Sequence, residues 1–183
     1  MIIGITGTDG AGKGAAVDCL VSKGFTHCSA RALWLDEIRK RSLEPIRANM
    51  RIVANSLRAR HGDDYLVSEY LRRAADAGWQ DIVIESIRAL AEAVTLKARG
   101  GILLAVDAEP HIRYERIQER ASESDRVTFK EFIAHEQMEM NDPDPHGMQK
   151  AKVIAMADYT LRNNGTLEEL HAQVEKVLAQ IKR

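Results

Sequence analysis

The sequence predicts an α/β fold built around a parallel sheet, and two observations carry that prediction. Short apolar runs alternate along the chain with segments of helical periodicity, as strands and helices do in βαβ units. Several of these runs are continuous rather than alternating, which is typical of strands buried on both faces. The expected strands are residues 2–5, 25–28, 82–84, 102–106 and 159–161.

The segments between these runs predict helices. The clearest is the last one, whose apolar stripe consists of Leu167, Leu170, Val174, Val177, Leu178 and Ile181. Thr166 and Glu169 form a capping box at its start, and Thr128 with Glu131 forms a second one ahead of another helix. Residues 30–77 show much helical pattern and no convincing strand, so we expect a helical excursion between the second and third strands.

Length and composition limit the class of protein. A chain of 183 residues, 45% hydrophobic and 29% charged, predicts one compact domain over residues 1–183. With 26 Lys+Arg against 27 Asp+Glu, it lacks the basic excess of a dedicated nucleic-acid binder. We find no membrane-span pattern and no signal-peptide pattern, and Cys19 and Cys28 do not make a disulfide framework. We therefore expect a soluble, cytoplasmic enzyme with no nucleic-acid or membrane partner, and the oligomeric state stays open.

A glycine-rich loop follows the first expected strand and opens a helix. Its residues are Gly7, Thr8, Asp9, Gly10, Ala11, Gly12, Lys13 and Gly14. This is the G-x-x-x-x-G-K pattern of a phosphate-binding P-loop, in which backbone N–H groups and the helix N-terminus face phosphate oxygens and Lys13 adds a point charge. Gly14 stands where a Ser or Thr hydroxyl usually contacts Mg²⁺, and Ala15 follows. Mg²⁺ would then be held through water and other carboxylates, or the site is altered.

Acidic and basic residues also follow other expected strands. Glu85 ends a buried strand, where α/β sheets place ligands, so it could bind Mg²⁺ through water or an acceptor; it could also merely neighbour a helix cap. Arg88 could hold an acceptor phosphate or be an exposed first-turn residue. Asp107 ends the fourth strand, and Pro110 follows in the first turn of the next helix, so we expect Asp107 to cap that helix.

Three arginines share one face of the helix after the fourth strand. Arg113, Arg116 and Arg120 are spaced by three and four residues. They could neutralise a phosphoryl group during transfer, a reaction that depends on positioning and charge stabilisation. Glu115 and Glu119 could instead pair with them on a solvated face. Arg116 and Arg120 are the catalytic candidates.

These features together resemble the P-loop nucleoside monophosphate kinase superfamily, in particular adenylate-kinase-like and dephospho-coenzyme A kinase-like proteins and phage deoxynucleoside monophosphate kinases. The similar segments are residues 7–14, 57–64, 84–88, 106–108, 113–126 and 157–170. The resemblance implies a P-loop NTPase-type five-stranded parallel sheet flanked by helices. It also implies that residues 30–77 form a helical acceptor-binding region and that residues 113–128 form a lid.

The resemblance further implies ATP as phosphoryl donor, with Mg²⁺. Lys13 and the amides of the P-loop would hold the donor, and Asn164 and Gly165 would pack on its adenine or simply form a tight turn. Asp9 would contact the acceptor or its metal, as acidic residues do in thymidylate-kinase-like loops. The candidates to hold an acceptor phosphate are Arg31, Arg39, Arg58 and Arg88.

The acceptor is the open question. Dephospho-coenzyme A kinases carry an Asp just after the second strand, and here the first acid is Asp36. The Gly-Asp-x-x-Arg run of adenylate kinases is also missing from residues 30–35. We expect a nucleoside or deoxynucleoside monophosphate as acceptor, with dephospho-coenzyme A as the alternative. Gly14 and Ala15 offer no hydroxyl, so a non-catalytic nucleotide-binding or regulatory protein is a second alternative. The balanced net charge weighs against a third alternative, an ATPase that remodels nucleic acid.

Overall fold

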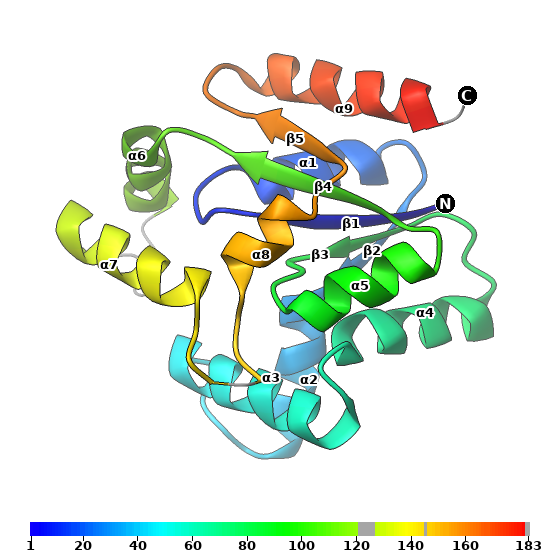
Figure 1. The fold of residues 1–183 in the computed structure, drawn as a ribbon, viewed down its shortest axis with the longest axis vertical. Helices are drawn as coiled ribbons and strands as arrows, with labels where there is room; N and C mark the ends of the chain where they lie inside the picture. The colour runs from blue at the N-terminus through cyan, green and yellow to red at the C-terminus, as the bar shows by residue number, and fades with distance from the viewer. Residues whose placement is uncertain (121–126, 145, 182–183) are drawn as a thin grey trace.

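A computed structural model describes residues 1–120, 127–144 and 146–181 of the chain. These residues form a five-stranded parallel sheet with the strand order β2-β3-β1-β4-β5 and helices on both faces (Figure 1). The strands are β1 (Ile2–Gly7), β2 (Thr26–Ser29), β3 (Ile82–Glu85), β4 (Ile102–Asp107) and β5 (Tyr159–Arg162). The predicted α/β class and all five predicted strands are confirmed, and each strand extends one or two residues further at its carboxyl end.

The helices lie in the segments between and after the strands. They are α1 (Lys13–Val21), α2 (Ala30–Lys40), α3 (Arg47–His61), α4 (Tyr65–Ala77), α5 (Leu90–Ala98), α6 (Pro110–Arg120), α7 (Phe129–Met140), α8 (Lys150–Ala155) and α9 (Leu167–Ile181). Both predicted capping boxes are present, at the starts of α7 and α9. Among the described residues, no helix combines the length and the apolar character needed to cross a membrane.

Two apolar cores cover the two faces of the sheet. One core packs β-strand residues such as Leu104 against α1 and α9, and the other packs residues such as Leu103 against α2, α3, α4, α5 and α8. Consecutive residues along a central strand therefore serve different cores. This explains the continuous apolar runs: side chains alternate between the two faces of a strand, and both faces of these strands are buried.

The segment 30–77 consists of α2, α3 and α4, which lie together at the end of the molecule opposite α9 (Figure 1). Trp34 in α2 is buried in the core, with its ring 6.3 Å from that of Tyr65. The Arg58 guanidinium lies 5.8 Å from the centre of the Trp34 ring. Trp34 is thus a packing residue, and its ring is not open to an acceptor base.

Candidate active site

The P-loop runs from the end of β1 into the start of α1. Gly10 has φ 78° and Gly12 has φ 92°, a left-handed backbone that strongly favours glycine. A side chain on Gly10 would collide with the backbone of Arg113, and one on Gly12 with the side chain of Asn163. Gly12 caps α1 without any side-chain hydrogen bond, so the first-turn N–H groups of α1 have no side-chain cap. This arrangement suits an anion such as a phosphate.

Lys13 lies folded back over the loop. Its Nζ donates hydrogen bonds to the carbonyl oxygens of Thr8, at 2.6 Å, and Gly7, at 3.3 Å. Burial lowers the pKa of Lys13 to about 8; the nearby cations Arg88 and Lys150 also lower it, while the Asp9 carboxylate raises it. The protonation of Lys13 therefore responds to neighbouring charges at a pH close to neutral.

Long-range hydrogen bonds hold the P-loop in place. The Thr8 hydroxyl donates to Oδ1 of Asp107 at 2.7 Å, and Nδ2 of Asn163 donates to the carbonyl of Ala11 at 2.8 Å. The expectation that Asp107 caps the next helix is wrong, because α6 begins only at Pro110 and the Asp107 side chain accepts the Thr8 hydroxyl instead. The loop is thus fixed to the ends of both β4 and β5.

The three arginines of α6 have different partners. Arg113 is buried and donates to the carbonyl oxygens of Ala108 and Asp9, and it forms a two-pronged ion pair with Glu136 of α7. Arg116 donates to the carbonyl oxygen of Asn163 at 2.8 Å, and Arg120 is exposed. Arg113 thus ties α7 to the P-loop, and Arg116 supports the loop after β5. Residues 121–126 of the expected lid lie outside the described residues.

Five charged side chains meet beside the P-loop, and we call them the phosphate-site cluster: Asp9, Lys13, Arg88, Glu139 and Lys150. Oδ1 of Asp9 lies 3.5 Å from Nζ of Lys13, 3.3 Å from Nη2 of Arg88 and 3.5 Å from Nζ of Lys150. Oε2 of Glu139 lies 2.9 Å from Nζ of Lys150 and 3.8 Å from Nη1 of Arg88. The cluster brings together the P-loop, the segment after β3, and both α7 and α8.

The backbone of Arg88 is held from two sides. Its N–H donates to Oε2 of Glu92 at 2.9 Å, and its carbonyl accepts the N–H of Gln149 at 2.9 Å. Glu92 is fully buried, and its other oxygen accepts two hydrogen bonds from Arg58, at 2.9 Å and 3.0 Å. Arg58 is itself buried and neutralises Glu92, which fixes Arg88. The expectation that Arg58 holds an acceptor phosphate is therefore wrong.

Glu85 lies at the carboxyl end of β3, as the sequence predicts. Its carboxylate is within hydrogen-bond distance of a residue that the sequence analysis did not single out, His27. Nε2 of His27 in β2 lies 2.9 Å from Oε2 of Glu85, and Ser29 at the end of β2 is paired with Glu85 in the sheet. Among the described residues, no group of three or more His, Cys, Asp and Glu side chains is placed to hold a metal ion. Carboxylate oxygens such as those of Glu85 and Asp9 do fit Mg²⁺ held partly by water.

The remaining predicted site residues border the cluster or lie apart from it. Arg31 is exposed in the first turn of α2, a helix capped by the Ser29 hydroxyl, and Arg39 pairs with Asp36. Oδ1 of Asn164 accepts the N–H of Glu109 at 2.8 Å, which fixes the loop containing Gly165 beside the start of α6. Gly14 is exposed, and a side chain there would meet no atom within 4 Å. Ala15 packs against the core between the sheet and α9.

Sequence reasoning missed His27 and Glu92, and it also missed three residues of α7 and α8, namely Glu136, Glu139 and Lys150. Neither of these two helices carries a catalytic or phosphate-binding motif. One signal was present: Lys150 is the first residue of α8, where a cation opposes the helix dipole, so it needs an acidic partner. The sequence does not say which acid that is.

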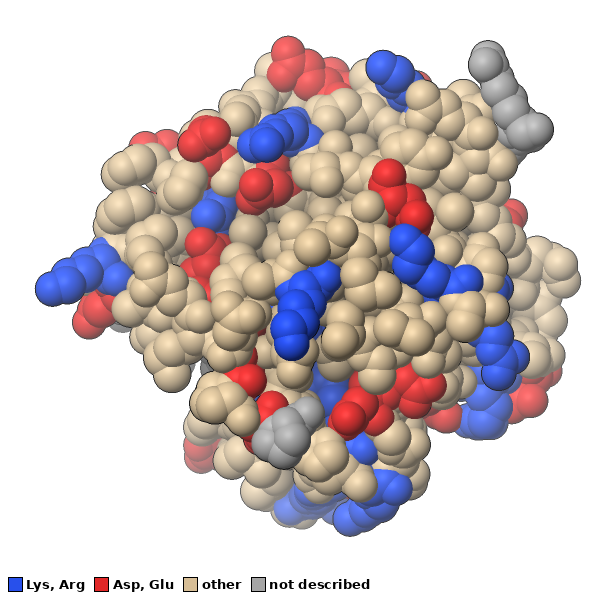
Figure 2. Space-filling view, viewed as in Figure 1, with Lys and Arg blue, Asp and Glu red and all other residues tan. Residues whose placement is uncertain are grey.

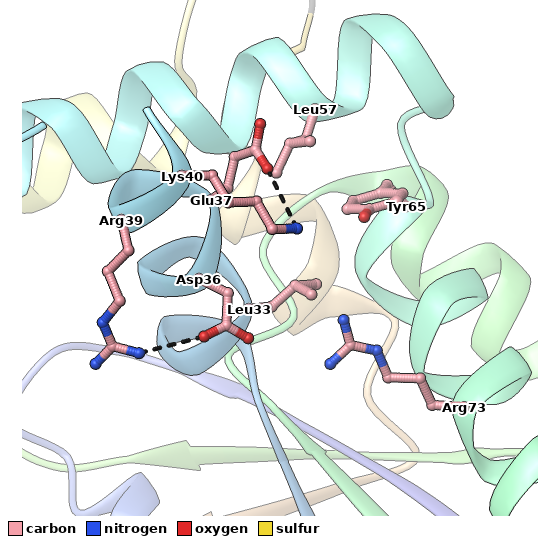
Figure 3. A pocket seen from close by; sticks show the side chains of 8 residues that line it. All are labelled: Leu33, Asp36, Glu37, Arg39, Lys40, Leu57, Tyr65 and Arg73. Carbon is pink, nitrogen blue, oxygen red and sulfur yellow. Dashed lines mark hydrogen bonds and ion pairs between the residues drawn. The ribbon is translucent and has the colours of Figure 1, made fainter. Parts of the chain in front are cut away.

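A cavity of about 230 Å³ lies between α2, α3 and α4 (Figure 3). Its lining residues are Leu33, Asp36, Glu37, Arg39, Lys40, Leu57, Tyr65 and Arg73. The charged side chains have partners along their own helices. Asp36 pairs with Arg39 and Glu37 with Lys40 (Figure 3). Arg73 pairs with Glu69. The cavity shares no residue with the phosphate-site cluster and adds none to it.

The strand order and the P-loop with Lys13 define a protein of the P-loop nucleoside monophosphate kinase-like superfamily. Residues 3–144 match a family described as an AAA domain. A UPF0200 protein of Thermococcus kodakarensis is 33% identical over 187 residues, which is 99% of this chain and 98% of the relative. Another, from Hyperthermus butylicus, is 29% identical over 182 residues, 99% of this chain and 95% of the relative. The chain belongs to the UPF0200 family and carries its P-loop within that AAA domain.

Solved structures share the fold. TT1252 from Thermus thermophilus has a TM-score of 0.67 at 23% identity, covering 98% of this chain and 97% of that one. Shikimate kinase from Bacteroides thetaiotaomicron has a TM-score of 0.60 at 12% identity, covering 100% and 99%. Dephospho-CoA kinase from Campylobacter jejuni has a TM-score of 0.57 at 13% identity, covering 98% and 96%. At these identities the likeness establishes the P-loop kinase fold and nothing finer.

Proposed function

We propose that the protein transfers a phosphoryl group from ATP to a small nucleotide acceptor, a nucleoside or deoxynucleoside monophosphate. The observation that carries the proposal is the meeting of Lys13 and Arg88 at one oxygen of Asp9, at 3.5 Å and 3.3 Å. Lys13 belongs to the donor loop, and Arg88 follows the strand end where an acceptor would lie. Phosphoryl transfer depends on positioning the two substrates and on neutralising the transferred group, and cations that meet from both sides suit that reaction.

On the donor side, Lys13 and the amides of residues 7–15 would hold the phosphates of ATP. Asn164 and Gly165 would pack on the adenine, and Arg116 would keep their loop in place through its bond to Asn163. Arg120 would approach the phosphates from the lid. Mg²⁺ bound to ATP would neutralise phosphate oxygens, with Glu85 and Asp9 as the carboxylates that hold its water ligands.

On the acceptor side, Arg88 and Arg31 would hold the acceptor phosphate. Both come from segments that follow strands β3 and β2, at the same edge of the sheet as the P-loop. A phosphate acceptor is already anionic, so it needs no general base. The proposal places the enzyme in the cytoplasm, and both cysteines are free and buried, so the fold needs no oxidising compartment.

Two specific observations favour other functions. Glu85, supported by His27, lies beside the end of β2, so a carboxylate is present that could serve as base for a hydroxyl acceptor such as dephospho-coenzyme A or shikimate. Gly14 and Ala15 offer no hydroxyl after Lys13, which favours a protein that binds the nucleotide without transferring its phosphate. These candidates differ in what they do with ATP.

A coupled assay of ADP release with ATP and Mg²⁺ tests the three candidates. The acceptor panel contains the ribo- and deoxynucleoside monophosphates, dephospho-coenzyme A and shikimate. We expect turnover with a monophosphate, which Lys13→Ala abolishes while the circular dichroism spectrum is unchanged. Lys152→Ala, which removes an exposed lysine of α8, is the matched control and should keep full turnover. Full turnover in Lys13→Ala, or signal only with a hydroxyl acceptor, contradicts the proposal; silence with tight ATP binding supports the non-catalytic candidate.

A further inference from the structure

Three cationic side chains among the described residues converge on a single oxygen atom. Lys13, Arg88 and Lys150 place their nitrogens within 3.3–3.5 Å of Oδ1 of Asp9. They come from α1, from the turn after β3 and from α8, so only the tertiary fold brings them together. Several cations around one oxygen are an arrangement that suits a phosphoryl oxygen, which binds best to charged donors already in place.

Lys150 is the least expected member of this group. Its side chain has no exposed surface, and Nζ lies 2.9 Å from Glu139 at the end of α7. Burying a charged lysine is costly unless it is paired. Lys150 is also the first residue of α8, where a positive charge interacts unfavourably with the helix dipole. A methionine or leucine would pack there at lower cost. Lys150 is paired with Glu139 and Asp9, and a buried ion pair of this kind adds little stability compared with an apolar side chain.

The charge count of the phosphate-site cluster points to an anion. The cluster contains three positive side chains and two carboxylates, those of Asp9 and Glu139. Lys13 has a pKa lowered to about 8 by burial and, to a lesser extent, by the cations Arg88 and Lys150, while the Asp9 carboxylate raises it. An added phosphate meets an excess of positive charge that is already in place.

We propose that Lys150 is a third phosphate-binding cation of this site, and that Oδ1 of Asp9 holds the position that an oxygen of the terminal phosphate of ATP takes on binding. The terminal phosphate displaces the Asp9 carboxylate from Lys150 and Arg88. Asp9 is then an internal competitor of the donor nucleotide. The inference rests on the proposed function only in taking ATP as the ligand.

The rest of the cluster keeps Lys150 and Arg88 ready for the phosphate. Glu139 bridges Lys150 and Arg88 through one oxygen, and the N–H of Gln149 donates to the carbonyl of Arg88. The start of α8 is therefore joined directly to the turn that carries Arg88. When Asp9 leaves, the two cations stay where they are because Glu139 still holds them. Preorganised charges of this kind bind an anion without a cost of rearrangement.

The test is calorimetric titration of ATP and of ADP in EDTA, so that no metal contributes. Asp9→Asn removes the competing charge, and we expect it to tighten ATP binding roughly tenfold. Lys150→Met should weaken ATP binding by roughly tenfold or more, with less than about a twofold change for ADP. Lys152→Met, on the exposed side of α8, is the matched control and should change neither.

The double variant Asp9→Asn/Lys150→Met shows whether the two residues act on one another. The gain from Asp9→Asn should shrink when Lys150 is absent, because one of the freed cations is missing. Weaker or unchanged ATP binding in Asp9→Asn overturns the proposal, as does an equal loss of ATP and ADP binding in Lys150→Met. If Lys150→Met does not fold, Asp9→Asn, a change in a part-exposed loop residue, decides alone.

These outcomes are separate from the acceptor assay. A protein that shows the expected order of ATP affinities and phosphorylates nothing retains this inference and loses the proposed function. A protein that phosphorylates a monophosphate and shows no opposite effects of Asp9→Asn and Lys150→Met retains the function and loses the inference.

Discussion

Nδ2 of Asn163 donates a 2.8 Å hydrogen bond to the carbonyl oxygen of Ala11, and the two residues are buried together. This bond joins the loop after β5, where the adenine of the donor would lie, to the loop that would hold its phosphates. The same Asn163 offers its carbonyl oxygen to Arg116. One residue thus connects the P-loop, the loop after β5 and α6.

Asn163→Ala should lower the free energy of unfolding by about 1–2 kcal/mol, because it leaves the buried Ala11 carbonyl without its partner. It should also weaken nucleotide binding, since the P-loop loses a support. The measurement is urea denaturation without nucleotide, followed by calorimetric titration of ATP. Asn164→Ala is the control, because Asn164 is exposed and should cost less stability. Equal losses of stability in the two variants would contradict the role given to Asn163.

ATP binding should take up protons around pH 8. The pKa of Lys13 is lowered to about 8 in the free protein, and phosphate oxygens favour the charged lysine, so binding raises that pKa again. We expect uptake of about half a proton at pH 8 and about a tenth at pH 7, read from calorimetry in buffers of different ionisation enthalpy.

Asp9→Asn gives the matched control for this pH dependence. The Asp9 carboxylate raises the pKa of Lys13, so its removal should lower that pKa further and increase proton uptake at pH 7. The pKa of Lys13 in the fold lies below the ordinary 10.5, so the unfolded chain binds more protons between pH 8 and 10.5. Lys13 therefore makes the folded protein relatively more stable as pH rises through that window. Equal uptake at pH 7 and pH 8 would rule out this assignment.

Arg58→Met should destabilise the fold by about 3–5 kcal/mol, because it leaves the buried Glu92 carboxylate without its cation. Arg60→Met, on the same helix and exposed, should change stability by less than about 0.5 kcal/mol. Urea denaturation measures both. Adding Glu92→Gln to Arg58→Met should recover part of the loss, since the uncompensated charge is removed. No recovery would show that packing rather than charge is what Arg58 contributes.

Gly14→Ser should strengthen the Mg²⁺ dependence of ATP binding several-fold, because it supplies the hydroxyl that P-loops commonly present to the metal. A side chain at Gly14 meets open space, so the substitution causes no clash. Gly14→Ala is the matched control: it shares the better helix propensity of Ser over Gly and lacks the hydroxyl. ATP affinity is measured at graded Mg²⁺ concentrations. Identical behaviour of the Ser and Ala variants would show that this site does not use a hydroxyl there.

Figure 2 shows acidic and basic side chains scattered over the same face, with apolar and neutral surface between them. On the described residues of that face, no continuous basic stripe appears. Nucleic-acid backbones are generally bound through such a stripe.

The sequence by itself determined what depends on near neighbours along the chain. The five strands follow from short apolar runs, and the P-loop from its glycines, because left-handed backbone is cheap only for glycine. The capping boxes of α7 and α9 are equally local, since each bond spans three residues. The position of Glu85 at the end of a strand, with Arg88 three residues on, also followed from the sequence, and their roles toward a ligand stay predictions.

Only the tertiary structure decided which charges meet. Arg58, Arg113 and Asp107 each looked available in the sequence, yet they pair with Glu92, Glu136 and Thr8. Lys150 carried no motif and lies against Asp9. The reason is physical. A buried positive charge requires an acidic partner, and the sequence contains 27 Asp and Glu residues without indicating which of them pairs with a given Lys or Arg. The choice is made by the packing of α7 and α8 against the P-loop, at distances along the chain where local sequence patterns carry no information.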